Sequence, residues 1–155
     1  MPNALTWLSD GRMIAIHMAQ ILLTIASIIF LVLGTLHGVL TLRDVAKPRA
    51  FTPTDDAVRI AMQNTRLRFN PRANFWQAWL GFNLSHSLGI VIFGGGLLFL
   101  AWVHFPAFAA GHLLQGAAMA VPAAYLIIAL RFWFWGPAFG AGLSLLCIVA
   151  AVVLS

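Results

Sequence analysis

Positions 13–42 form a stretch of thirty residues without an Asp, Glu, Lys or Arg. The hydrocarbon core of a bilayer is about 30 Å thick, and about 20 apolar residues in a helix cross it. A water-soluble domain of this size needs no such stretch, so we expect an integral membrane protein. The run is also too long for the apolar part of a signal peptide, and we expect it to remain in the mature protein as a helix.

Three further apolar runs follow the first. The four predicted spans cover residues 13–40, 76–102, 107–130 and 137–155. Hydrophobic residues make up 61% of the chain and charged residues 8%, against roughly 25% charged residues in a soluble domain. Because no water reaches the backbone inside a bilayer, each span must be helical. The sequence therefore predicts an all-α integral membrane protein, in which residues 1–155 form one domain and four transmembrane helices pack as an up-down bundle.

The basic residues lie almost entirely in one loop. Seven of the nine Lys and Arg fall between Arg43 and Arg72, together with three Asp. In the predicted arrangement Arg131 lies on the same side as this loop, and Arg12 lies on the other. Loops rich in Lys and Arg stay in the cytoplasm. We therefore expect the loop 43–74 in the cytoplasm and both termini outside, with membrane lipids rather than nucleic acid as the partner of the basic residues.

This loop also contains a predicted amphipathic helix. Thr52, Pro53 and Asp55 have the order of an N-cap, a proline at the first helical position and an acid at the third. Apolar or small residues then recur at helical spacing, at Val58, Ala61, Met62, Thr65 and Phe69. Such a helix suits an anionic membrane surface. It is either a basic connector that holds the topology or a lid over a site that opens to the cytoplasmic leaflet.

Polar side chains at membrane depth are costly and therefore mark candidate sites. The densest group lies in the segment 79–89, WLGFNLSHSLG, where Asn83 and His86 share one helical face. A separate stripe of small residues, which we expect to pack against another helix, is formed by Gly81, Ser85 and Gly89. In the first span Gly34 and Gly38 stand four residues apart beside His37. Close helix packing at this glycine pair predicts that His37 lies near Asn83 and His86.

His37, Asn83 and His86 form the candidate catalytic site. Imidazole can bind a metal or heme iron, and it can transfer protons near neutral pH. We expect His86 to be the ligand or the acid and base, and His37 to be the second ligand or the proton partner. Asn83 would orient a carbonyl, epoxide or hydroxyl group of a lipophilic substrate. The plainer alternative is that the three side chains only tie helices together by hydrogen bonds.

A b-type heme is one cofactor that these residues could hold, and the cofactor is left open. Such a heme needs axial imidazoles, an apolar pocket and cationic groups near its propionates, but no CxxCH motif. His86 and His37 could supply the axial positions, as they could for another metal. Arg131 or Arg43 could meet the propionates.

Several classes of protein are disfavoured. The predicted spans hold no acidic residue, which counts against a carboxylate-driven transporter and a di-iron carboxylate site. The single cysteine, Cys147, excludes an internal disulfide. We expect a homo-oligomeric, membrane-embedded enzyme or cofactor-binding protein that acts on a lipophilic small molecule, of isomerase or oxidoreductase type. The alternatives are a non-catalytic accessory or structural subunit, a lipid carrier and an oligomeric channel.

Two resemblances bear on these expectations. At WLGFNLSHSLG (79–89) and NTRLRF (64–69) the chain resembles a group of small four-span bacterial membrane proteins over most of its length. That resemblance implies a bacterial inner-membrane setting but no activity. In size and four-span layout the chain is also similar to styrene oxide isomerases, small membrane enzymes that use heme as a Lewis acid. Their His and Asn stand in a different order and spacing, so the second resemblance is architectural only.

Overall fold

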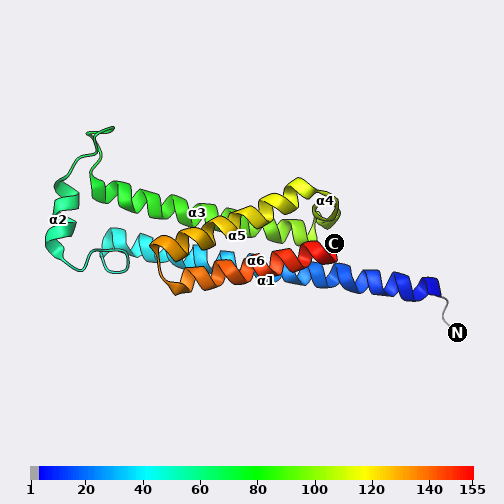
Figure 1. The fold of residues 1–155 in the computed structure, drawn as a ribbon. Helices are drawn as coiled ribbons and strands as arrows, with labels where there is room; N and C mark the ends of the chain where they lie inside the picture. Colours follow the sequence, from blue (N-terminus) through cyan, green and yellow to red (C-terminus); the bar gives the residue numbers. More distant parts are fainter. Residues whose placement is uncertain (1–3) are drawn as a thin grey trace. The chain divides into compact units, whose positions relative to one another are not determined.

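The computed structural model describes residues 4–155, and their side chains from Gly11 onward. In this part of the chain the secondary structure is helical, apart from one isolated bridge between Arg66 and Asn74. The helices are α1 (Ala4–Ala46), α2 (Asp56–Asn64), α3 (Phe75–Trp102), α4 (Phe105–Ala110), α5 (His112–Phe132) and α6 (Trp135–Leu154) (Figure 1). The predicted all-α class is confirmed.

Among the described residues, four helical segments are long enough and apolar enough to cross a membrane. They are Gly11–Ala46 of α1, and the whole of α3, α5 and α6. Large apolar side chains such as Ile14, Ile92 and Val153 are exposed on these helices, as lipid contact allows. With 43 residues, α1 is about 65 Å long, which is about twice the thickness of a bilayer core.

The third predicted span, 107–130, is interrupted in the structure. The short helix α4 ends at Ala110, and α5 begins at His112 rather than at 107. At Gly111, between them, a Cβ would lie 2.6 Å from the backbone oxygen of Ala107. The chain can therefore make this tight connection only with glycine, and a continuous helix is replaced by two.

The chain divides into two compact units. Unit 1 consists of Met1–Leu33 and Ile92–Ser155, and unit 2 consists of Gly34–Val91. Both α1 and α3 pass from one unit into the other, because the division falls within each helix.

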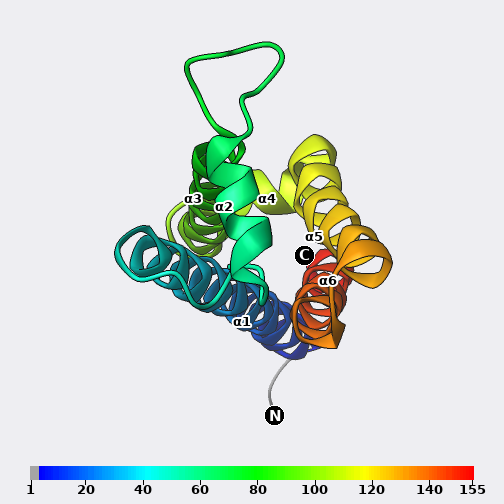
Figure 2. The same cartoon turned by 90° about the vertical axis from the view of Figure 1, so that its left-hand side faces the viewer.

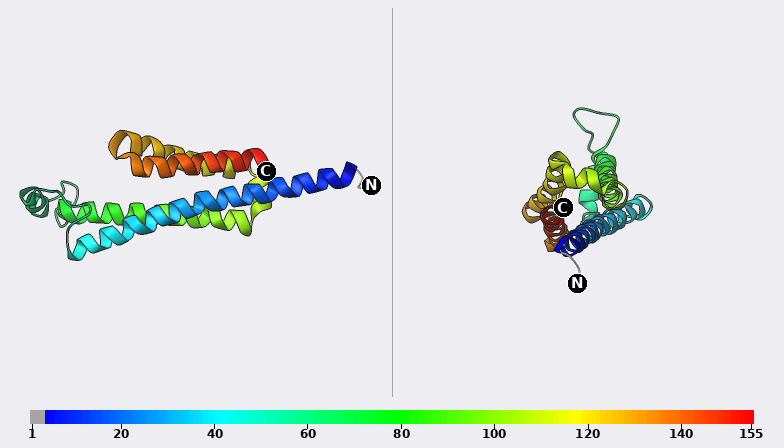
Figure 3. Two further views of the ribbon diagram at one scale, coloured as in Figure 1. Left: turned by 90° about the horizontal axis from the view of Figure 1, so that it is seen from below. Right: turned by 90° about the vertical axis from the view of Figure 1, so that its right-hand side faces the viewer.

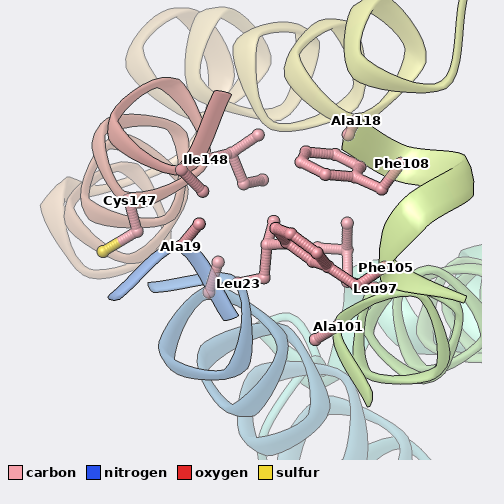
Figure 4. Close-up of a cluster of buried hydrophobic side chains, with 11 residues drawn as sticks. Ala19, Leu23, Leu97, Ala101, Phe105, Phe108, Ala118, Cys147 and Ile148 are labelled. Carbon is pink, nitrogen blue, oxygen red and sulfur yellow. The ribbon is translucent and has the colours of Figure 1, made fainter. Parts of the chain in front are cut away.

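Unit 1 is built around an apolar core. Its helices α5 and α6 run side by side (Figure 3). Phe105, Phe108, Leu97 and Ile148 point toward one another in this core (Figure 4), and the side chains of Phe108 and Ile148 are fully buried. The core thus joins residues from α3, α4 and α6, and it fixes these helices by close packing.

Within unit 1, hydrogen bonds also join α1 to α3. The Ser27 hydroxyl donates to the Gly94 carbonyl at 2.6 Å, and the Gln20 amide donates to the Ala101 carbonyl at 2.9 Å. At Gly94 a Cβ would lie 3.1 Å from the Ser27 carbonyl oxygen, so glycine permits the approach that the serine bond requires.

Unit 2 holds the basic loop. There α2 lies across the ends of α1 and α3 (Figure 1), and residues 65–74, which we call the finger, project beyond α2 (Figure 2). The predicted helix in this loop is present, but its predicted start and extent are wrong. Asp55 is the N-cap and accepts a hydrogen bond from the Ala57 N–H, whereas the Thr52 hydroxyl donates to Asp44. The helix ends at Asn64, so Phe69 belongs to the finger.

Candidate functional site

Two glycines of α1 allow a close approach to α3 within unit 2. A Cβ at Gly34 would lie 2.7 Å from Cγ2 of Ile90. A Cβ at Gly38 would lie 3.3 Å from Cβ of Ser87. Both distances are shorter than ordinary packing contacts, so the close packing predicted for this glycine pair is confirmed.

The small-residue stripe predicted on α3, in contrast, makes no close contact within the described part of the chain. A Cβ added at Gly81 or Gly89 would meet no atom within 4 Å in the described part of the chain, and Ser85 between them is exposed. The face that packs carries Asn83 and Ser87, whose side chains are 0% and 5% exposed. Close packing needs small residues on one helix only. Since α1 supplies the glycines, α3 can bring larger polar side chains to the contact.

The closest polar contact between α1 and α3 in unit 2 joins His37 to Asn83. Nε2 of His37 lies 3.0 Å from Oδ1 of Asn83. The Asn83 amide nitrogen donates to the Trp79 carbonyl at 2.8 Å, and this bond fixes Oδ1 as the end that faces His37. An amide oxygen only accepts, so Nε2 of His37 must carry the proton. Asn83 thereby selects one protonation pattern of the His37 ring.

His86 lies against the same imidazole. Its ring centroid is 5.4 Å from that of His37, with the two planes at 69°. The Phe82 ring stacks on the His86 ring, with the centroids 6.0 Å apart and the planes at 18°. His86 is half-buried, whereas Asn83 is completely buried. The structure therefore brings together His37, Asn83 and His86, and it leaves His86 the more accessible of the two groups on α3.

The two arginines considered for the site are placed differently. Arg131 lies at the end of α5 in unit 1, exposed, with its guanidinium carbon 5.5 Å from the centroid of the Phe132 ring. Arg43 lies in unit 2, in the last turn of α1, and is exposed.

A loop segment that was not among the predicted site residues covers His37. This segment, residues 47–52, which we call the strap, places the Phe51 ring 4.3 Å from the His37 ring, centroid to centroid. Nε1 of Trp79 donates to the Phe51 carbonyl at 2.8 Å and holds the strap against α3. An aromatic ring thus closes one side of the His37 imidazole.

Asp44 holds the strap in this shape. Its carboxylate is 1% exposed and accepts hydrogen bonds from four donors. They are the backbone N–H groups of Arg49, Ala50 and Phe51, at 2.9, 2.9 and 2.6 Å, and the Thr52 hydroxyl at 3.2 Å. A buried carboxylate needs such donors to offset its loss of water. An acid in the last turn of a helix is unfavourable beside the helix dipole, so the sequence indicates that Asp44 needs a partner but not which groups supply it.

The two imidazoles are the candidate ligands in this cluster. The described residues include no group of three or more His, Cys, Asp or Glu side chains placed to hold a metal ion. Since Nε2 of His37 is bound to Asn83, a metal at that nitrogen would displace the hydrogen bond. His86 is therefore the better candidate for a single axial ligand.

This chain matches no protein-family model, no curated protein and no solved structure. Its function is therefore argued from the His37 cluster of unit 2 and its surroundings.

Proposed function

We propose that this chain is a multi-pass membrane enzyme that moves a proton within a lipophilic small molecule, an isomerase-type reaction, at the imidazole pair His37 and His86. The observation that carries this proposal is the 3.0 Å contact from His37 to Asn83, with a second imidazole centred 5.4 Å away. One ring is held in a fixed orientation and protonation pattern, and the other is close enough to act with it.

The contacts of the three side chains suggest how the work is divided. His37 and His86 are both half-buried, and His86 acts at the substrate as the base and then the acid. His37, held by Asn83 and covered by Phe51, is the proton partner. Asn83 is completely buried with both ends of its amide engaged, so its role here is to position His37 rather than to bind substrate.

The proposed reaction needs no co-reactant. The neutral imidazole of His86 removes a proton from the carbon beside a carbonyl group, and the carbonyl oxygen takes the negative charge. The imidazolium then returns a proton to another atom of the same substrate. Atoms and electrons balance within the molecule, and no group is oxidised or reduced. The Phe82 and Phe51 rings beside the imidazoles favour an apolar substrate.

The proposal includes a location and an arrangement. Four apolar helices cross a bacterial inner membrane as an up-down bundle, with both termini outside and the loop 43–74 in the cytoplasm, as the basic residues of that loop favour. The uncovered stripe at Gly81 and Gly89 supports contact with a second copy of the chain, because small residues let helices approach closely in lipid.

The first test measures proton exchange. The purified protein in lipid nanodiscs is incubated in D2O with a panel of aryl and alicyclic ketones, and deuterium uptake beside the carbonyl is followed by mass spectrometry. We expect His86→Gln to lower the rate about 100-fold or more, the usual contribution of a general base. His112→Gln, which alters an exposed histidine of α5, serves as the matched control and should leave the rate unchanged. Equal uptake by the wild type and His86→Gln across the panel would contradict the proposal.

A non-catalytic structural subunit is the second candidate function. The complete burial of Asn83, with bonds to His37 and Trp79, is what a side chain that only joins helices would show. In that case replacements of His37 and Asn83 lower stability, and His86→Gln changes neither stability nor any activity. A selective loss of proton exchange in His86→Gln, with unchanged stability, separates the two functions.

A cofactor-dependent version of the enzyme would use His86 as the axial ligand of a b-type heme, because Nε2 of His37 is engaged. The visible spectrum of protein purified from heme-replete cells checks this version. It predicts a Soret band that His86→Ala abolishes and that His112→Ala retains. A colourless, fully folded preparation would rule out the heme and leave acid–base chemistry.

A further inference from the structure

The finger, residues 65–74, is a folded loop rather than an open connection. The N–H of Leu67 donates to the Ala73 carbonyl at 3.2 Å, and the N–H of Ala73 donates to the Asn70 carbonyl at 3.1 Å. At its base the N–H of Phe75 donates to the Thr65 carbonyl at 2.9 Å. These bonds return the chain from the end of α2 to the start of α3 and present the residues between them at a tip that projects away from both helices (Figure 2).

The charge of the finger is entirely positive. Arg66, Arg68 and Arg72 lie in it, and the sequence holds no Asp or Glu after Asp56. Within the part of the chain whose side chains are described, the one ion pair joins Arg59 to Asp56 at 3.1 Å, outside the finger. Asp44 is no partner for these arginines either, since its buried carboxylate is bound to the strap. The finger therefore presents positive charge that acidic groups of the described chain do not neutralise.

An apolar ring stands between these charges. Phe69, next to Arg68, is 86% exposed. An aromatic ring so exposed to water is unfavourable, but aromatic side chains are stable at the level of lipid headgroups. The distance along the chain fits this location. Six residues after Phe69, the apolar helix α3 begins at Phe75.

We propose that the finger binds the anionic lipid surface of the membrane that the apolar helices cross. Phe69 enters the headgroup layer, and the guanidinium groups of Arg68 and Arg72 bind lipid phosphates. Arginine suits this role because its planar group can donate two hydrogen bonds to one phosphate. This binding depends on the charge and exposure of the finger and does not require the function proposed for the His37 cluster.

The test measures the polarity around the finger, and its contact with lipid, in the whole chain. An environment-sensitive fluorophore is attached to Asn70→Cys in a Cys147→Ser background, because Cys147 is the only natural cysteine. The protein is placed in nanodiscs of phosphatidylcholine alone or mixed with phosphatidylglycerol, and spin-labelled lipids report contact with the bilayer. We expect a blue shift and quenching in the discs that contain phosphatidylglycerol, and their loss at high salt.

Substitutions then show which residues cause the fluorescence shift and the quenching. Each arginine near an anionic surface strengthens binding about fivefold. The double variant Arg68→Gln with Arg72→Gln should therefore lower the ratio of lipid-bound to unbound finger about 25-fold. Phe69→Ser should also reduce it. The matched control, Arg43→Gln with Lys47→Gln, removes the same charge from unit 2 outside the finger and should leave the signal unchanged. Size-exclusion profiles and helical circular dichroism establish that each variant is folded.

A second measurement avoids the label. Native mass spectrometry of the unlabelled protein should show retained phosphatidylglycerol, which the paired Arg68 and Arg72 substitutions remove. The proposal is overturned if the label stays in water in both kinds of disc, if its shift is the same without phosphatidylglycerol, or if the control pair abolishes it equally. A shift produced only by added polyglutamate would also overturn it and would indicate an acidic protein partner.

Discussion

The helices α1 and α3 are joined by two different kinds of polar contact in the two units. In unit 1, Ser27 and Gln20 of α1 donate to backbone carbonyls of α3. In unit 2, an imidazole of α1 meets an amide side chain of α3. A carbonyl oxygen only accepts hydrogen bonds and does not change its protonation state near neutral pH. The bonds in unit 1 can therefore only hold the helices together. An imidazole bound at one nitrogen can still gain or lose a proton at the other. The same helix pair thus combines a part that serves stability with a part capable of chemistry.

The buried residues differ in the same way. The largest fully buried side chains of unit 1, which also buries Ser27 and Ser144, are Phe108, Leu23 and Ile148. Those of unit 2 are Asn83, Thr41 and Asp44. Apolar packing in unit 1 tolerates no loss of volume, because protein interiors are closely packed. Unit 2 instead depends on each buried polar group keeping its partner. Substitutions of matched size should therefore act through different causes in the two units.

Phe108→Ala should have the largest effect on stability. It removes a fully buried ring from the core of unit 1, and such truncations cost about 3–5 kcal/mol. Unfolding by SDS, followed by circular dichroism of the purified protein, measures the change. Phe139→Ala is the matched control, because that ring, on α6 of the same unit, is 66% exposed. Equal losses in the two variants would show that unit 1 is not held by its core.

Asn83→Leu should have the next largest effect, about 1–3 kcal/mol, because it keeps the side-chain volume but leaves the His37 N–H without its acceptor. Adding His37→Phe removes that unpaired donor, so the double variant should recover part of the loss. Its unfolding free energy, compared with both single variants, isolates the contact. Strictly additive losses would mean that the two side chains do not depend on each other.

Ser27→Ala should have the smallest effect, about 0.6 kcal/mol, the average for side-chain hydrogen bonds between helices in lipid. The Ser27 bond ends on a backbone carbonyl of α3, and its loss leaves no buried donor unpaired on that helix. The same SDS titration measures it. A loss of unfolding free energy as large as that of Asn83→Leu would show that the polar contacts of the two units contribute equally to stability.

The apolar helices and the meeting of His37, Asn83 and His86 could be predicted from the sequence. A helix needs a minimum length of apolar residues to cross lipid, and such a run can be read directly from the sequence. Gly34 and Gly38 likewise indicate where α1 can approach another helix closely. His37, which lies between them in the sequence, takes part in that helix contact. In both cases the signal lies in regular spacing along a helix.

The strap could not be predicted, because its partners carry no signal in side-chain type. Asp44 is bound mainly by backbone N–H groups, which every residue except proline possesses. The same contact explains the error at Thr52, whose hydroxyl is used by Asp44 and is not available to cap α2. The lack of a close contact at Gly81 and Gly89 within the described residues has another cause. Small residues show that a close approach is possible, and they do not show which helix makes it.

The bonds of Asp44 also bear on the order in which the chain folds during synthesis. Its four partners lie five to eight residues after it, so the strap can close as soon as Thr52 has emerged. The contact between His37 and Asn83 spans 46 residues and must wait for α3. Contacts between near neighbours form before distant ones. The strap, and with it the Phe51 ring beside His37, can therefore form before α3 has been synthesised.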